Sequence, residues 1–160
     1  MIDLNEAGEL MDPVNRRLLC ELHADPRITM SALARAIGMS APAVTERVQR
    51  MQRAGVITGF RMEVDPAALG MPVSAFARVR PAPGQLAKVA ALAESLDQVS
   101  ECHRITGEDC FLVRVHVSTL ADLEDLLDRF LAYGQTTTSV IVSSPVPPRP
   151  LPVSPSDTGS

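Results

Sequence analysis

Apolar residues recur at helical spacing in three short stretches of the N-terminal third of the chain. The first stretch begins after Asp12, a good helix N-cap, and its apolar stripe consists of Val14, Leu18, Leu19 and Leu22. The second lies between Thr29 and Gly38, and its stripe consists of Met30, Leu33, Ala34 and Ile37. The third follows Ser40, and its stripe consists of Val44, Val48 and Met51. The pattern predicts three helices followed by a short strand or wing at residues 56–64.

The turn between the second and third predicted helices has the spacing of a helix-turn-helix. That motif needs a small residue where the helices cross, a glycine in the turn and an aliphatic residue on the inner face of the second helix. Ala34, Gly38 and Val44 supply these three residues in order. The third helix would then direct its N-terminal residues at base edges in the major groove. Plain three-helix interaction modules are the alternative interpretation.

The outward positions of this third helix carry hydroxyl, amide and guanidinium groups, which are the groups that read bases and hold phosphates. The residues predicted mainly to contact phosphate are Arg47, Arg50 and Arg53. The residues predicted to read bases are Ser40, Thr45, Glu46 and Gln49. Double-stranded DNA is therefore a predicted partner.

The rest of the chain alternates between strand and helix patterns. The predicted elements are a strand at 73–80, a helix at 85–96, strands at 99–106 and 110–117, a helix that begins at 118–122 and reaches residue 131, and a strand at 136–144. The order βαββαβ predicts a ferredoxin-like domain, so the chain is expected to be α+β with an N-terminal helix-turn-helix. The expected segments are a tail at 1–11, a helix-turn-helix domain at 12–63, a linker at 64–72, a ferredoxin-like domain at 73–144 and a Pro-rich tail at 145–160.

Two features of this second domain and its tail bear on partners. One sheet face of a ferredoxin-like domain lacks helices. Apolar residues occur at both alternating sets of positions in the predicted strands, as Phe76 and Ile141 illustrate, so this bare face cannot be wholly polar. An apolar bare face predicts a second copy, and hence a homodimer.

The Pro-rich tail is expected to be extended and loosely held; a disordered end is favoured over packing of Val146 or Leu151 on a neighbouring subunit.

The charge distribution sharpens the division into domains. The net charge of −4 argues against nucleic acid at first sight, yet residues 16–61 hold eight arginines against three acids. Residues 1–15 hold four acids and no base, and residues 62–160 hold seven bases against twelve acids. This asymmetry favours a nucleic-acid-binding module joined to a module with a different role.

Composition excludes several classes. One Tyr, no Trp and four Phe provide no aromatic platform for single-stranded bases. No apolar run suits a membrane span or a secretory signal, and three scattered cysteines suit reduced thiols, so a cytoplasmic protein without membrane contact is expected. No metal site or cofactor is predicted, because Cys102 and His103 are adjacent on a strand and point to opposite faces. No motif of an enzyme occurs, and catalysis is not expected.

Taken together, several motifs resemble the Lrp/AsnC, or feast/famine, family of transcription regulators over residues 10–145. They include Leu33-Ala34, Gly38-Met39-Ser40, residues 44–48 with Arg47, Ala54-Gly55-Val56-Ile57, and residues 99–102 leading to Thr106-Gly107-Glu108-Asp109. The resemblance implies dimers that assemble into a higher oligomer. It also implies an amino acid or related metabolite bound by the C-terminal domain, with oligomeric state and DNA binding that respond to it.

The resemblance also implies where this effector would bind. The family's Gly-Asp-x-Asp turn falls on Gly107, Glu108 and Asp109, with Cys110 where an acid is usual. The ammonium group of an amino acid needs a carboxylate beside it, so Glu108 or Asp109 is the candidate. The second contributing loop falls on residues 134–138, where the candidates are Gln135, Thr136 and Thr138. The alternative is a simple hairpin turn and a Thr-rich strand.

Two other functional hypotheses remain open. One is a small-molecule-binding module that regulates an enzyme by protein contact, without DNA, with its helices as a docking surface. The other is a winged-helix repressor of another family, which would lack a separate α/β ligand domain. Both are distinguishable by DNA binding and by the fold of residues 73–144.

Overall fold

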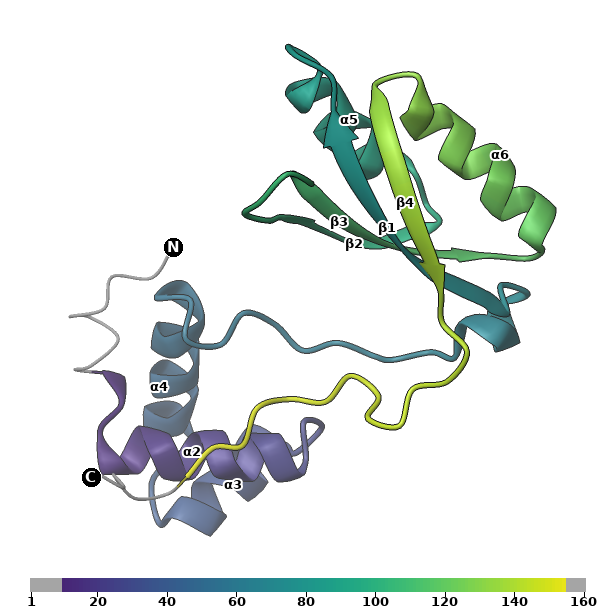
Figure 1. Ribbon diagram of the computed structural model, residues 1–160. Coiled ribbons are helices and arrows are strands. Elements are labelled where there is room, and N and C mark those ends of the chain that lie inside the picture. The colour runs from purple at the N-terminus through teal and green to yellow at the C-terminus, as the bar shows by residue number, and fades with distance from the viewer. Residues whose placement is uncertain (1–9, 155–160) are drawn as a thin grey trace. The chain divides into compact units, whose positions relative to one another are not determined.

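The computed structural model describes residues 10–154. Within this range the chain forms two compact units, one from residues 10–62 with 148–154 and the other from residues 63–147 (Figure 1). Each unit has its own hydrophobic core. We call them the helical unit and the sheet unit.

Three helices make the helical unit: α2 (Pro13–Ala24), α3 (Met30–Ile37) and α4 (Ala41–Arg53). Each begins at a side-chain cap, because Asp12, Thr29 and Ser40 accept the backbone N–H three residues on. Gly38 ends α3 with φ of 79°, a left-handed conformation that favours glycine and turns the chain into α4. The predicted apolar stripes form one core, whose buried members are Leu18, Leu22, Leu33, Ala34, Ile37, Val44, Val48 and Met51. The helix-turn-helix prediction is confirmed.

The strand predicted at residues 56–64 does not form. Val56 and Ile57 are half-buried against the helical core, and both backbone N–H groups donate to the Met51 carbonyl, at 2.9 and 3.1 Å. Beyond them the backbone is irregular, and Met62 is 87% exposed. The alternation is weak, and no second strand is present in the described part of the helical unit to pair with it.

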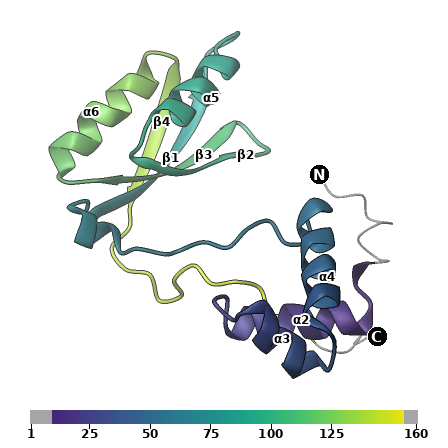
Figure 2. The ribbon, with the colours of Figure 1, turned by 180° about the vertical axis from the view of Figure 1, so that it is seen from behind.

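The sheet unit follows the predicted order βαββαβ. Its elements are a 3₁₀ turn η1 (Pro66–Leu69), β1 (Val73–Pro81), α5 (Leu86–Ser95), β2 (Val99–Arg104), β3 (Phe111–Val117), α6 (Leu120–Leu131) and β4 (Gly134–Val140). The strands are antiparallel in the order β2-β3-β1-β4. Figure 2 shows both helices on one face of this sheet. The α+β, ferredoxin-like prediction is confirmed.

The last strand lies earlier in the chain than the predicted 136–144. It pairs with β1, with Gly134 opposite Pro81 and Val140 opposite Ala75. A Cβ atom on Gly134 would lie 2.1 Å from the Arg80 carbonyl oxygen, so only glycine allows this close approach. The glycine therefore belongs to the strand and fixes its register.

The sheet unit's core lies between the sheet and the two helices. Inward residues of β1 and β3 are almost fully buried: Ala75, Ala77, Val79, Phe111, Val113, Val115 and Val117. They pack against Val89 and Ala93 of α5 and against Leu123, Leu126 and Phe130 of α6. Thr119 and Asp122 form a capping box at the start of α6.

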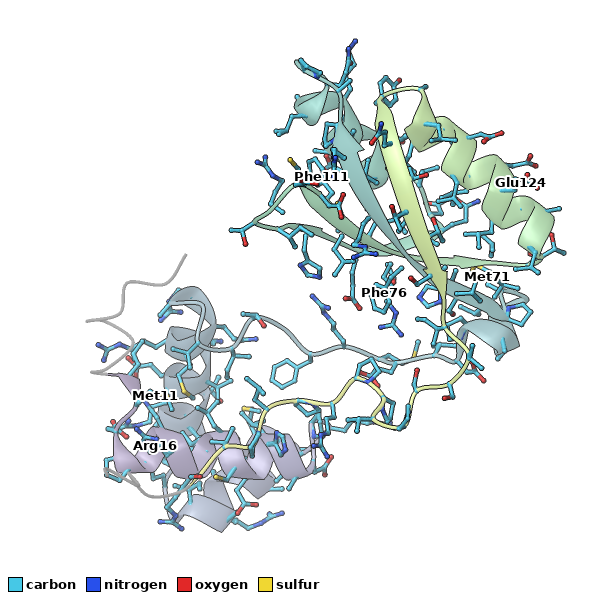
Figure 3. The ribbon with its side chains drawn as sticks, in the orientation of Figure 1. Met11, Arg16, Met71, Phe76, Phe111 and Glu124 are labelled. Carbon is cyan, nitrogen blue, oxygen red and sulfur yellow. The ribbon has the colours of Figure 1, made fainter. Side chains whose placement is uncertain are left out.

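The bare face of the sheet carries apolar residues, as predicted, but most of its positions are polar, so it is mixed in character. Phe76 and Leu112 are half-buried on this face, but Arg78, Arg80 and Arg114 share it with them. Figure 3 labels Phe76 on this bare face and Phe111, which lies on the helix side of the sheet. The strict alternation of β1 sends its Ala and Val side chains to the helices, which leaves mainly polar side chains on the other face.

The described part of the C-terminal tail is irregular. Val146 and Leu151 are exposed, whereas Val153 is half-buried and its carbonyl accepts the Cys20 thiol at 3.4 Å in the helical unit. The expectation of a disordered end concerns the last residues, of which 155–160 lie outside the described range, as do 1–9 of the predicted N-terminal tail.

Candidate DNA-binding surface and effector site

Helix α4 buries one face and presents the other to solvent. Val44, Val48 and Met51 are at most 5% exposed and hold the helix on α2 and α3. Four exposed residues recur at i, i+3, i+4 and i+7, which gives a continuous stripe along the outer face: Glu46, Gln49, Arg50 and Arg53. Of the residues in 10–154, none forms an ion pair with Arg50 or Arg53.

The two predicted hydroxyl readers lie at the start of α4. The exposed Ser40 caps the helix by accepting the Ala43 N–H at 3.4 Å. The half-buried Thr45 hydroxyl donates to the Ala41 carbonyl at 2.8 Å. Because its proton is engaged, Thr45 offers a base edge an acceptor rather than a donor.

Arg47 differs from the other α4 arginines. One of its terminal nitrogens donates to Asp12 Oδ2 at 2.8 Å and to Asn15 Oδ1 at 3.0 Å. Asn15 is only 3% exposed, and its amide nitrogen donates to the Leu10 carbonyl at 2.9 Å. Burial tends to raise the pKa of Asp12, but the Asn15 N–H and the Arg47 guanidinium outweigh it and lower this pKa below 3.8.

The predicted effector turn connects β2 to β3. Gly107 has φ of 108°, which favours glycine, and Glu108 and Asp109 follow it. Glu108 forms an ion pair with Arg80, and Asp109 Oδ1 lies 3.7 Å from Arg80 Nε. Asp109 Oδ2 lies 3.9 Å from Arg78 Nε. The turn therefore holds two carboxylates beside two guanidinium groups.

Sequence reasoning did not find the two arginines. The sequence does contain an indication of them, because Arg78 and Arg80 alternate with alanine and valine in a strand whose intervening positions are all apolar. What the sequence did not reveal is that β3 and its turn pair with β1, which brings the carboxylates to these arginines.

The predicted residues of the second loop separate onto two faces. Gln135 lies opposite Arg80 and shares its face of the sheet. Thr136 and Thr138 lie opposite Val79 and Ala77, on the helix side, and both are half-buried. The half-buried Cys110 packs against the sheet unit's core. Of the predicted effector residues, the structure brings Gln135 to the face of the two arginines beside the turn and leaves the two threonines on the opposite face.

A second polar group lies on the bare face of the sheet. His116 is 8% exposed and sits between the Ser74 hydroxyl at 2.7 Å and the Ser100 hydroxyl at 3.0 Å. Burial, and then the charge of Arg114, lower the pKa of His116 below 6.5 against the opposing effect of Glu101. Glu101 accepts from Arg114 at 3.0 Å, and this hydrogen bond lowers the pKa of Glu101.

Two features are absent from the described residues, namely a group of metal-ligating side chains and a helix long enough to span a membrane. Across residues 10–154, no three His, Cys, Asp or Glu side chains are grouped so that they could hold a metal ion. No helix in that range has the length and apolar character to cross a membrane.

A capped helix-turn-helix joined to a separate α+β unit defines a two-part DNA-binding regulator. Two family models match these parts: a winged helix-turn-helix DNA-binding model over residues 11–58 and the Lrp/AsnC ligand binding domain over residues 74–151. The chain belongs to the Lrp/AsnC family of transcription regulators.

Relatives support this assignment along most of the chain. The HTH-type transcriptional regulator LrpA of Mycobacterium tuberculosis is 36% identical over 140 residues, which cover 86% of this chain and 93% of the relative. LrpC of Bacillus subtilis is 32% identical over 83% of this chain and 92% of its own length.

Solved structures agree with the fold. The structure of B. subtilis LrpC has a TM-score of 0.77 at 32% identity and covers 83% of this chain and 95% of its own. A feast or famine regulatory protein from M. tuberculosis, complexed with L-methionine, has a TM-score of 0.80 at 33% identity. The match covers 88% of this chain and 98% of that one.

Proposed function

We propose that this transcription regulator places α4 in the major groove of DNA. The observation that carries the proposal is the exposed stripe of α4, because its arginines lack internal partners within the described residues while its opposite face is fully packed. In this docking Arg50 and Arg53 contact phosphates, and the base readers are Ser40, Thr45, Glu46 and Gln49. Arg47, predicted with the other two arginines, is held by Asp12 and is not counted among these phosphate contacts.

The docking is tested by selecting duplexes from a random library with the full chain and measuring affinity by fluorescence anisotropy. A selected sequence motif, and a Gln49→Ala variant that discriminates less between that motif and a mutated one, support base reading by α4. Arg129→Gln, an exposed change on α6 of the sheet unit, serves as the control. No binding of any duplex at about 0.1 M salt would contradict the proposal and favour a module that regulates an enzyme without DNA.

Two half-sites require two copies of α4, so the acting species in this proposal is a homodimer. Membership of the Lrp/AsnC family supports further assembly of such dimers into a higher oligomer. The relatives are transcriptional regulators of bacteria, which supports a place of action in the cytoplasm, and in this proposal the chain's activity is binding rather than catalysis. A winged-helix repressor of another family is not supported, because residues 74–151 match the Lrp/AsnC ligand binding domain.

We propose that the effector is an amino acid or a related metabolite and that it binds at the mixed-charge turn. Glu108 or Asp109 faces the ammonium group, and Arg78 or Arg80 with Gln135 and the backbone at Gly107 faces the carboxylate. The neighbouring structure that contains L-methionine supports this class of ligand. In this proposal the half-buried Thr136 and Thr138 have no direct contact with the effector.

The effector site is tested by thermal shift with a panel of amino acids and keto acids, starting with methionine. The Glu108→Gln variant should lose the shift caused by an active amino acid while its own melting temperature changes little, because the Glu108 side chain is 82% exposed. Glu94→Gln, an exposed glutamate on α5, is the control. Equal shifts in all three proteins would exclude Glu108 as the partner of the ammonium group, and a shift that also persists in Asp109→Asn would place the site elsewhere.

A further inference from the structure

Arg47 is the residue of α4 whose geometry departs most from a phosphate contact. Its side chain is 34% exposed, and its guanidinium is held by two acceptors at the start of α2. Asp12 also caps α2 through its other oxygen, which accepts the Asn15 N–H at 2.7 Å. A single carboxylate therefore fixes both the first turn of α2 and the second turn of α4.

Asn15 completes the arrangement. Its side-chain oxygen accepts from Arg47, and its side-chain nitrogen donates to the Leu10 carbonyl. Because Asn15 is buried, removal of Arg47 leaves a polar oxygen without its partner inside the unit. The contact thus connects the segment before α2, helix α2 and helix α4.

We infer that Asp12, Asn15 and Arg47 form a latch that fixes the orientation of α4, so that Arg47 acts in DNA binding as a positioning residue and not as a phosphate contact. The inference rests on the proposed docking of α4. It follows that the three α4 arginines have two roles. Arg50 and Arg53 contribute positive charge that is not paired within the described residues, and Arg47 holds α4 in its orientation.

Salt dependence separates these roles. An arginine that neutralises a phosphate releases counterions, and its loss lowers the slope of log K against log salt by about 1. Arg47 already has Asp12 as its counter-charge at 2.8 Å, so its loss should weaken binding with no change of slope. The alternative is that Arg47 leaves Asp12 on binding and reaches a phosphate.

Asp12→Asn provides the sharpest variant. Asparagine is as good an N-cap as aspartate, so the cap of α2 is retained and only the charge that holds Arg47 is removed. A latch predicts weaker DNA binding in this variant. A phosphate-contacting Arg47 predicts binding that is equal or tighter, because a competing negative charge is gone.

The experiment measures anisotropy of the full chain on one selected duplex across a salt series, with thermal unfolding recorded for each variant. We expect Asp12→Asn and Arg47→Gln each to weaken binding roughly fivefold at unchanged slope. The double variant should be little worse than either single variant, in affinity and in melting temperature. Arg47→Lys, which retains a charge for Asp12, should restore part of the affinity.

A slope lowered by about 1 in Arg47→Gln, or equal or tighter binding by Asp12→Asn, overturns the latch. Arg50→Gln and Arg53→Gln are measured beside them. If neither lowers the slope, the docking proposal fails, and the latch is then judged on the coupling of Asp12 and Arg47 in thermal unfolding. Independent effects on the melting temperature would overturn it there.

Discussion

Helix α4 of the helical unit and the bare face of the sheet unit both carry three arginines but pair them differently. In the sheet unit Arg78, Arg80 and Arg114 each face a carboxylate of Asp109, Glu108 or Glu101. On α4 of the helical unit, only Arg47 is paired with an acid among the described residues. The arginines on the bare face of the sheet are therefore paired with acids, whereas in the described part of the chain Arg50 and Arg53 of α4 are not, a difference that the whole-chain charge of −4 conceals.

The largest expected effect tests whether the two cores are independent. Leu33 is fully buried in the helical unit, and Leu33→Ala should destabilise that unit by about 3 kcal/mol through a cavity. Hydrogen exchange should then accelerate in α2, α3 and α4 and remain unchanged in the sheet. Phe130→Ala, in the other core, should produce the reverse pattern, and a uniform change in both variants would mean that the chain has one cooperative core.

A smaller effect is expected where β4 begins. Gly134→Ala places a Cβ against the Arg80 carbonyl, so it should cost the sheet unit about 2 kcal/mol by overpacking. The melting transition assigned to the sheet should fall while that of the helices stays. An unchanged transition would contradict the pairing of Gly134 with Pro81 at the start of β4; Ser139→Ala, an exposed change on the same strand, is the control.

The two units should also lose stability in different ranges of pH. Burial lowers the pKa of His116 below 6.5, so as pH falls the unfolded chain takes up this proton at a higher pH than the folded chain does. The free energy of unfolding of the sheet unit should therefore decrease as pH falls below about 6.5. The pKa of Asp12 is lowered below 3.8, so its contribution to the helical unit is complete above pH 3.8 and is lost only at more acidic pH.

Each titration involves one proton, so the free energy of unfolding cannot change by more than about 1.4 kcal/mol per pH unit. Chemical denaturation of the sheet unit between about pH 7.5 and about pH 5.5 measures the first effect. His116→Gln should remove it, because an amide retains hydrogen bonding without titrating in this range. A wild-type profile that is flat there would contradict the effect of burial on His116.

Most of the fold could be predicted from the sequence because it depends on local signals. Caps at Asp12, Thr29 and Ser40, the glycine at 38 and the apolar periods determine where helices begin and end. Residues 56–64 do not form the strand of the predicted strand or wing, and the bare face is only partly apolar, because both features depend on what lies opposite in space. Strand pairing, which places Ala75 and Val79 inward, was not visible in the periodicity of one strand.

The candidate sites divide in the same way. The outer stripe of α4 follows from helical spacing, so Gln49, Arg50 and Arg53 could be predicted as exposed. The engagement of Arg47 by Asp12 joins residues 35 apart, and no local rule indicates it. The alternation rule does separate Gln135 from Thr136, but the register with β1 was needed to know which of them faces Arg80.

The central claim is that the free arginines of α4 give this chain its affinity for DNA. The most direct measurement is the salt dependence of binding to one selected duplex for the full chain, for Arg50→Gln with Arg53→Gln, and for Arg104→Gln with Arg129→Gln. The first pair should lower the slope of log K against log salt by about 2, and the second pair, both exposed residues of the sheet unit, should leave it unchanged. Equal slopes for all three proteins, or a loss of slope only in the second pair, would contradict the account.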